Sequence, residues 1–126
     1  MSYQVYLIIE TGIPRDHHAL FVETNEAGPH TGQVFNVQGE IQNGMVFEHK
    51  TTDEPEKSPV FASKEHIGTV SHADFPRVLA VCQTIPVPKK QFDGAKRLFP
   101  KEPLRRCQEW AREAIDALVD AKVVQR

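Results

Sequence analysis

Short apolar runs and alternating apolar and polar positions fill the first half of the chain, a pattern typical of β-strands. Residues 3–11 are rich in Val, Ile and Tyr and predict a central strand. The extended pattern resumes at residues 17–23, 32–37 and 44–50. Asn43-Gly44 is a strong hairpin signal before the last of these stretches, and the polar residues 51–59 predict a loop.

The second half changes to helical spacing. A first helix is expected from about Asp74, its predicted N-cap, with one apolar face made of Phe75, Val78, Leu79, Cys82 and Ile85. Pro86 and Pro88 should end it. The last helix is expected to have Pro103 in its first turn and an apolar stripe over Leu104, Cys107, Trp110, Ala111, Ala114, Ile115 and Leu118. Trp110 lies on this stripe and is therefore expected to pack in the core.

Strands followed by helices predict an α+β fold in which a small antiparallel sheet packs against helices. A length of 126 residues fits a single domain, residues 1–126. The composition, 40% apolar and 25% charged, is typical of a soluble globular protein and argues against disorder.

Charge, cysteine content and hydropathy limit the classes of function. The net charge of −2 gives no reason to expect nucleic acid or an anionic membrane as a partner. The apolar run at residues 5–9 is too short for a bilayer span or a secretory signal. Two cysteines cannot build a disulfide framework and show no Cys-x-x-Cys spacing. We therefore expect a cytoplasmic protein without a cofactor.

The charges are unevenly distributed along the chain. Residues 1–57 carry nine acidic and three basic side chains, a balance of −6, whereas residues 89–106 carry seven basic and two acidic ones, a balance of +5. The basic segment is either a solvated loop that faces the protein's own acidic half or a docking surface for an acidic partner or substrate.

Cys107 has the strongest physical case for chemistry. It falls within the first two turns of the expected last helix, where free N–H groups and the helix dipole favour an anion, and Arg105 and Arg106 precede it. These conditions lower a thiol pKa and favour a thiolate nucleophile. The alternative is that Cys107 is a small apolar residue of the buried stripe. Cys82 has no basic neighbour and is expected to be a protonated core thiol.

A nucleophilic cysteine needs a base, normally histidine, held by a third polar group. Of the six histidines, His17 and His18 open a predicted strand and must point to opposite faces. His17 shares its face with the small Ala19, which leaves room for a helix terminus, so His17 is predicted to share a cleft with Cys107. No histidine pair has a ligand spacing on a predicted helix, and we expect no metal site.

Three separated segments resemble motifs of a known superfamily: residues 17–22 (HHALFV), 32–36 (GQVFN) and 107–110 (CQEW). Together they are similar to the circularly permuted papain-like group, which contains NlpC-type cell-wall peptidases, lecithin:retinol acyltransferase-like proteins and PPPDE-type isopeptidases. Small fungal proteins of unassigned role also have a Cys-Gln-x-Trp helix start. The resemblance covers roughly residues 15–120 and implies a permuted papain-like (NlpC-like) architecture.

The resemblance implies a Cys-His-Asn site in which Cys107 is the nucleophile, His17 the general base and Asn36 the residue that orients the imidazole. It implies hydrolysis or acyl or peptidyl transfer on an amide, ester or thioester of a small molecule or peptide. Arg106 stands where many relatives have Asn, and Asn36 replaces the second His of the acyltransferase branch. A Cys-His-Asn set is also a workable triad, but Arg106 and the absence of a recognisable substrate-specificity segment favour a second hypothesis, a catalytically silent binding or scaffold module that retains the fold.

Overall fold

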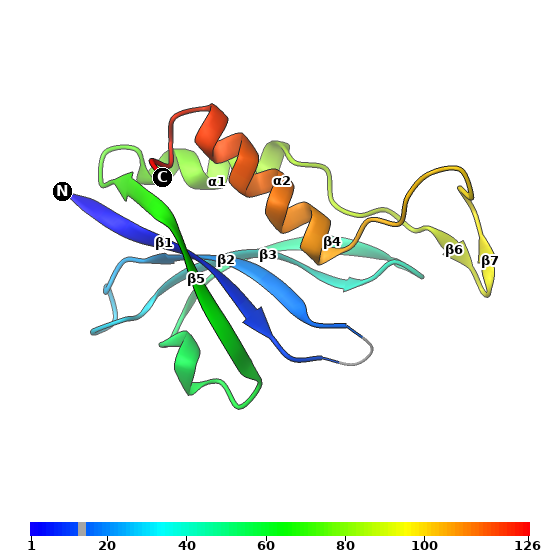
Figure 1. The fold of residues 1–126 in the computed structure, drawn as a ribbon, viewed down its shortest axis with the longest axis horizontal. Coiled ribbons are helices and arrows are strands. Elements are labelled where there is room, and N and C mark those ends of the chain that lie inside the picture. Colours follow the sequence, from blue (N-terminus) through cyan, green and yellow to red (C-terminus); the bar gives the residue numbers. More distant parts are fainter. Residues whose placement is uncertain (13–14) are drawn as a thin grey trace.

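The computed structural model describes residues 1–12 and 15–126, and its centre is a five-stranded antiparallel sheet with two helices packed against it (Figure 1). The strand order is β4-β3-β2-β1-β5, so β1, β2 and β3 are interior and β4 and β5 are the edge strands. The strands are β1 (Ser2–Glu10), β2 (His17–Glu23), β3 (Gly32–Glu40), β4 (Gly44–Thr52) and β5 (Phe61–Ser71). The other elements are the 3-10 turn η1 (Pro55–Lys57), the helices α1 (Phe75–Thr84) and α2 (Cys107–Asp120), and the small hairpin β6 (Phe92–Asp93) and β7 (Lys96–Arg97). The predicted α+β class is confirmed.

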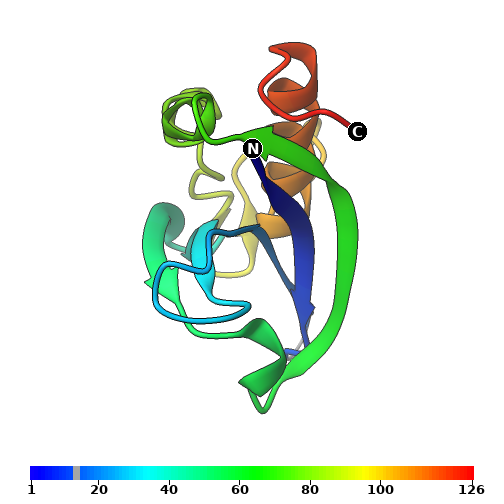
Figure 2. The same ribbon diagram turned by 90° about the vertical axis from the view of Figure 1, so that its left-hand side faces the viewer.

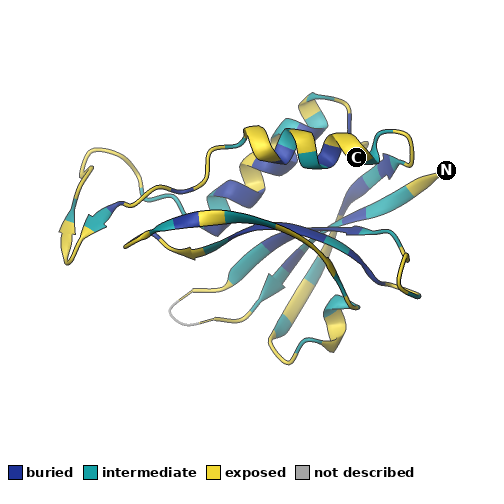
Figure 3. Cartoon of the chain, turned by 180° about the vertical axis from the view of Figure 1, so that it is seen from behind, coloured by how far each residue is buried: buried dark blue, intermediate teal, exposed yellow. Residues whose placement is uncertain are grey.

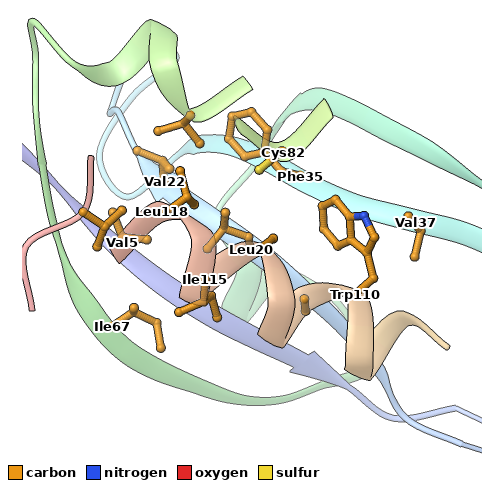
Figure 4. Packing of buried hydrophobic residues seen from close by; sticks show 14 of the residues in the cluster. Val5, Leu20, Val22, Phe35, Val37, Ile67, Cys82, Trp110, Ile115 and Leu118 are labelled. Carbon is orange, nitrogen blue, oxygen red and sulfur yellow. The ribbon is translucent and has the colours of Figure 1, made fainter. Parts of the chain in front are cut away.

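One face of the sheet forms the hydrophobic core with the helices. Alternate residues of β2 and β3 point into this core and meet side chains of α1 and α2 (Figure 4): Leu20, Val22, Phe35, Val37, Cys82, Trp110, Ile115 and Leu118. Trp110 is fully buried, as its place on the apolar stripe predicts, and the centroids of its indole and of the Phe47 ring are 5.7 Å apart. None of the described helices is long and apolar enough to cross a bilayer.

The opposite face of the sheet, which we call the open face, carries the intervening residues of the same strands. Ala19 and Phe21 of β2 and Val34 and Asn36 of β3 line a concavity there. Figure 2 shows that the sheet curves, so that β5 and the connection through η1 bend beneath this face. The open face is therefore a shallow cup rather than a flat surface.

The four predicted strands are present, but β5 was not expected from the sequence. The first half of β5 is polar and largely exposed, because this edge strand pairs only with β1 and needs few apolar residues. Its second half enters the core, and Thr69 pairs with Gln125 near the chain end. A Cβ at Gly68 would overlap the carbonyl oxygen of Gln125, so this close approach requires glycine.

The helices differ from expectation mainly at their starts. Helix α1 follows Asp74 as predicted and ends before Ile85, but Asp74 makes no side-chain capping hydrogen bond. Helix α2 begins at Cys107, so the prediction that Pro103 lies in its first turn was wrong. Residues 103–106 instead have no regular secondary structure, and Arg106 is extended, so Cys107 is the first helical residue.

Candidate functional site

The lead into α2 is fixed by a buried amide that the sequence did not mark as important. Gln91 is 6% exposed, and its side chain donates to the carbonyl oxygen of Arg105 at 2.8 Å and accepts from the N–H of Arg105 at 2.9 Å. This pair of hydrogen bonds occupies both backbone polar groups of Arg105. Arg106 is extended, and the helix begins only at the next residue. Gln91 therefore helps to set the position of Cys107.

The start of α2 is capped from within the helix. The Glu109 carboxylate accepts a hydrogen bond from the N–H of Arg106 at 2.7 Å, which is the return half of a capping box. The other half cannot form, because a guanidinium has no acceptor. The side chain of Arg105 is paired with Glu113 through two 2.8 Å hydrogen bonds. Arg105 is thus occupied by a carboxylate two turns along the helix.

Cys107 packs against the start of β2 and is 7% exposed. Its sulfur lies 3.9 Å from the carbonyl oxygen of Asp16, and the side-chain amide of Gln108 donates a hydrogen bond to the same oxygen at 2.6 Å. These contacts join the first turn of α2 to the residue that precedes β2. The thiol consequently lies at the edge of the core rather than deep within it.

Strands β2 and β3 separate at this end of the sheet. Their register pairs Leu20 with Phe35, Phe21 with Val34 and Val22 with Gln33, and no pairing continues toward the start of β2. Figures 1 and 3 show the β1–β2 and β3–β4 hairpins diverging on the side where α2 begins. The divergence leaves an opening between the helix side of the sheet and the open face.

A cleft of about 510 Å³ lies at this opening and brings Cys107 and His17 together. Its lining comes from the start of β2, the β3–β4 turn and the start of α2: Arg15, Asp16, His17, Gln38, Gly39, Glu40, Ile41, Gln42, Met45, Arg106, Cys107 and Gln108. His18 does not line the cleft. His17, rather than His18, thus shares the cleft with Cys107, as predicted, but the predicted reason is wrong, because α2 packs against the Leu20 and Val22 face of β2 and not against the Ala19 face.

The imidazole of His17 contacts Gln38, which was not predicted from the sequence as a site residue. The Nε2 atoms of the two side chains are 3.5 Å apart, and the Gln38 amide donates to Asn36 Oδ1 at 3.2 Å and to Glu48 Oε1 at 3.3 Å. Asn36 therefore reaches His17 through Gln38. Alternation along β3 could have indicated Gln38, because residues 36 and 38 share a face.

The three predicted site residues are thus only partly assembled. His17 and Asn36 are linked through Gln38 on the open face, whereas Cys107 approaches from the helix side. Within residues 1–12 and 15–126, no histidine ring nitrogen forms a hydrogen bond with the Cys107 sulfur. The described residues also contain no group of three or more His, Cys, Asp or Glu side chains that could hold a metal ion.

Burial controls the ionisation of the two thiols. It raises the pKa of Cys107 above its ordinary value, although the N–H groups of His18, Cys107 and Gln108 favour the thiolate. Desolvation therefore outweighs the helix terminus and the neighbouring arginines, which the sequence alone indicated would lower the pKa of this thiol. Burial alone raises the pKa of Cys82 to about 12, in line with its predicted role as a protonated core thiol.

Burial also lowers the pKa of His17, while Glu10 on the neighbouring strand partly opposes the change. The imidazole is consequently neutral near pH 7 and retains a nitrogen lone pair. A neutral thiol and a neutral imidazole in one cleft are the protonation states that general-base activation of a nucleophile requires.

The basic segment 89–106 does not face the acidic half of the protein through ion pairs. Its ion pairs among the described residues join Lys89 to Glu102 and Arg105 to Glu113. Figures 1 and 3 show the β6–β7 hairpin of this segment extending away from the sheet, with mostly exposed residues. The interpretation as a loop neutralised by residues 1–57 therefore gains no support.

No curated protein and no solved structure matches the chain. A family match, in contrast, covers residues 5–125, from β1 to the segment after α2 and thus every element of the candidate site. With nearly its whole length matched, the chain belongs to DUF6540, a family of unknown function.

Proposed function

We propose that this protein is a cysteine-dependent hydrolase or acyl or peptidyl transferase that acts on an amide, ester or thioester. The observation that carries the proposal is the shared cleft of Cys107, at the first position of a helix, and a neutral His17. The permuted papain-like resemblance of the sequence supports the same reading. A cleft of about 510 Å³ suits a small molecule or a short peptide segment.

In the proposed reaction His17 removes the proton of the Cys107 thiol as the sulfur attacks the carbonyl carbon of the substrate. The C–N, C–O or C–S bond then breaks, the leaving group takes the proton from His17, and a thioester remains on Cys107. Water or an acceptor amine or alcohol attacks this thioester, again with His17 as base, and releases the free thiol. The N–H groups of Cys107 and Gln108 are the proposed oxyanion donors.

The raised pKa of Cys107 decides between two ways of activating the thiol. A preformed thiolate–imidazolium pair would need a lowered thiol pKa, whereas transfer to a neutral imidazole during attack does not. In the proposal His17 turns from Gln38 toward the sulfur when substrate enters, since catalytic contacts are often long without substrate. Gln38 and, through it, Asn36 are positioning residues for the imidazole. The proposed compartment is the cytoplasm, where a free thiol stays reduced.

A second candidate function is a catalytically silent binding or scaffold module. The observation in its favour is that the Cys107 sulfur contacts a backbone carbonyl, that of Asp16, while the His17 ring contacts Gln38. In this reading Cys107 is a buried structural thiol, and the cleft serves only to bind. The two candidates differ in whether an acyl group is ever transferred to Cys107.

Acyl transfer to the thiol is the test. The protein is incubated with p-nitrophenyl acetate, and nitrophenol release is followed while intact-mass and peptide analysis locate any acetyl group. The proposal expects acetylation of Cys107 and turnover that Cys107→Ala abolishes. His17→Gln should lower the rate by about 10²–10⁴-fold, the usual contribution of a general base.

Matched variants separate catalysis from background chemistry. His18→Gln makes the same change one residue away, outside the cleft, and should leave the rate within a few-fold of the parent. Cys82→Ala removes the other thiol and should leave the acetylation site unchanged. Nitrophenol release that is equal in Cys107→Ala and the parent, with no acetyl-cysteine, would leave the silent module as the function.

A further inference from the structure

The cup on the open face contains a second pocket, of about 360 Å³, between the sheet and the connection from β4 to β5. Its floor is apolar and is made of Ile8, Ala19, Phe21 and Val34, which are buried although both helices pack against the other face. Cys107 does not line it. Gln38 lies on the wall between this pocket and the cleft of the candidate site.

A buried amide on the pocket wall has hydrogen-bonding capacity to spare. Asn36 is 3% exposed and lines the pocket. A primary amide offers two donors and an acceptor oxygen, yet among the described residues the Asn36 side chain makes one hydrogen bond, to Gln38. The Asn36 amide nitrogen has no partner among the described residues and is not fully enclosed, so it is accessible from the pocket. The remaining amide group of Asn36 is thus available to a ligand in the pocket.

The same wall carries a carboxylate without a cationic partner. Glu10 accepts a hydrogen bond from the Ser58 hydroxyl at 2.8 Å, and no Lys or Arg of the described chain is paired with it. His17 is its neighbour across β1 and β2, but the burial of that imidazole favours its neutral form. Three other carboxylates line the pocket. Glu48 has Lys50 at 3.5 Å and Asp53 has Lys57 at 3.6 Å, whereas Glu54, on the connection to β5, adds a second unpaired negative charge among the described residues. The negative charge of Glu10 is therefore left for a ligand to neutralise.

We propose that this pocket binds a small organic cation: an ammonium group on an apolar body, with a hydrogen-bond acceptor next to the ammonium. The ammonium would pair with Glu10, the acceptor would take a hydrogen bond from the Asn36 amide, and the apolar body would lie on the floor formed by Ile8, Phe21 and Val34. Each part of the ligand is thus complementary to one feature of the pocket wall or floor. The pocket does not need the thiol, so this inference stands apart from the proposed enzymatic activity.

Leucinamide is a suitable probe because it combines the three parts. The full chain is titrated with it at about pH 6.5, where an α-amino group is protonated, and backbone amide shifts are followed by NMR. Saturable shifts are expected at Asn36 on β3 and at Glu48, which lies opposite Asn36 on β4. The hydroxy analogue of leucinamide, which lacks the ammonium charge, should bind at least about tenfold more weakly, as loss of a charge-assisted hydrogen bond predicts. Isopentylamine, which lacks the amide acceptor, should also bind more weakly than leucinamide.

Variants locate the binding. Glu10→Gln keeps the shape and the contact with Ser58 but removes the charge, and should weaken leucinamide about tenfold or more. Glu65→Gln is the matched control on exposed β5 surface outside the pocket and should have no effect. Cys107→Ala should bind leucinamide as the parent does. The proposal is overturned if the hydroxy analogue binds equally well, if Glu10→Gln leaves the affinity unchanged, or if the shifts lie outside the cup.

Discussion

Replacing Trp110 with alanine should remove a large part of the stability of this protein. Trp110 is fully buried on α2, contacts Phe47 of β4, and donates its indole N–H to the carbonyl oxygen of Ile85 at 3.4 Å. It is the largest fully buried side chain and lies between the helix and the sheet. Deleting the indole leaves a cavity that close-packed neighbours cannot fill without moving.

The expected loss is about 3–5 kcal/mol, the range for large aromatic residues replaced by alanine in cores. A 126-residue domain has a free energy of unfolding of about 6–19 kcal/mol. Its unfolding entropy near the melting temperature is about 0.26 kcal/mol per kelvin, so the loss corresponds to a fall of about 11–19 °C in Tm. The variant should therefore still fold at room temperature but melt far below the parent.

Thermal unfolding followed by circular dichroism and calorimetry measures this difference. Trp110→Phe keeps an aromatic ring against Phe47 and should fall between the parent and Trp110→Ala. Arg112→Ala changes an exposed residue of the same helix and should stay within about 0.5 kcal/mol of the parent. A Trp110→Ala protein that melts within a few degrees of the parent would refute the claim that the indole is a core element.

Three further outcomes follow from ionisation and close packing. With iodoacetamide, Cys107 should react more slowly at neutral pH than a free thiol and should speed up only at higher pH, since burial raises its pKa. Cys82, with a pKa of about 12, should stay protected until unfolding. Alkylation of Cys107 at neutral pH as fast as that of a free thiol would contradict this. Gly68→Ala should lower the free energy of unfolding measured in urea by about 1–3 kcal/mol, because the added methyl group displaces Gln125 from its pairing with β5. An unchanged free energy of unfolding would count against that contact. The folded-state pKa of His17 lies below the unfolded value near 6.5, so the unfolded chain binds the proton first and the free energy of unfolding falls as the pH drops through that value. In urea titrations between about pH 7 and pH 5, His17→Gln should make this fall less steep. An equally steep fall in the variant would show that other groups cause it.

Most of the fold could be predicted because local pattern and tertiary context agree. The apolar alternation of β1 to β4 and the i, i+3, i+4, i+7 spacing of α1 and α2 reflect one buried face per element. β5 escaped prediction because an edge strand can be polar along half its length and still form its hydrogen bonds with β1. The β6–β7 hairpin is only two residues per strand and leaves no periodic signal.

The start of α2 shows where local rules were insufficient. Pro103 is a favourable first-turn residue, and the sequence alone places it inside the helix. In the folded protein the Gln91 side chain forms hydrogen bonds with both backbone groups of Arg105, which is 14 positions away in the chain, and so keeps those groups out of the helix. A hydrogen bond between distant residues outweighs a weak local preference, so the first helical residue is Cys107.

The chemistry of the site divides in the same way. The sequence by itself determined which side chains could react, but strand alternation puts His17 on the open face, opposite α2, and His17 lines the cleft with Cys107 because β2 and β3 separate there. Only the tertiary structure decided the surroundings that set their behaviour: the separation of β2 from β3, the contact of His17 with Gln38, and the burial that raises the pKa of the thiol. The physical reason is that residue types and periodicity are local properties, whereas desolvation and hydrogen-bond partners depend on segments that meet only when the chain folds.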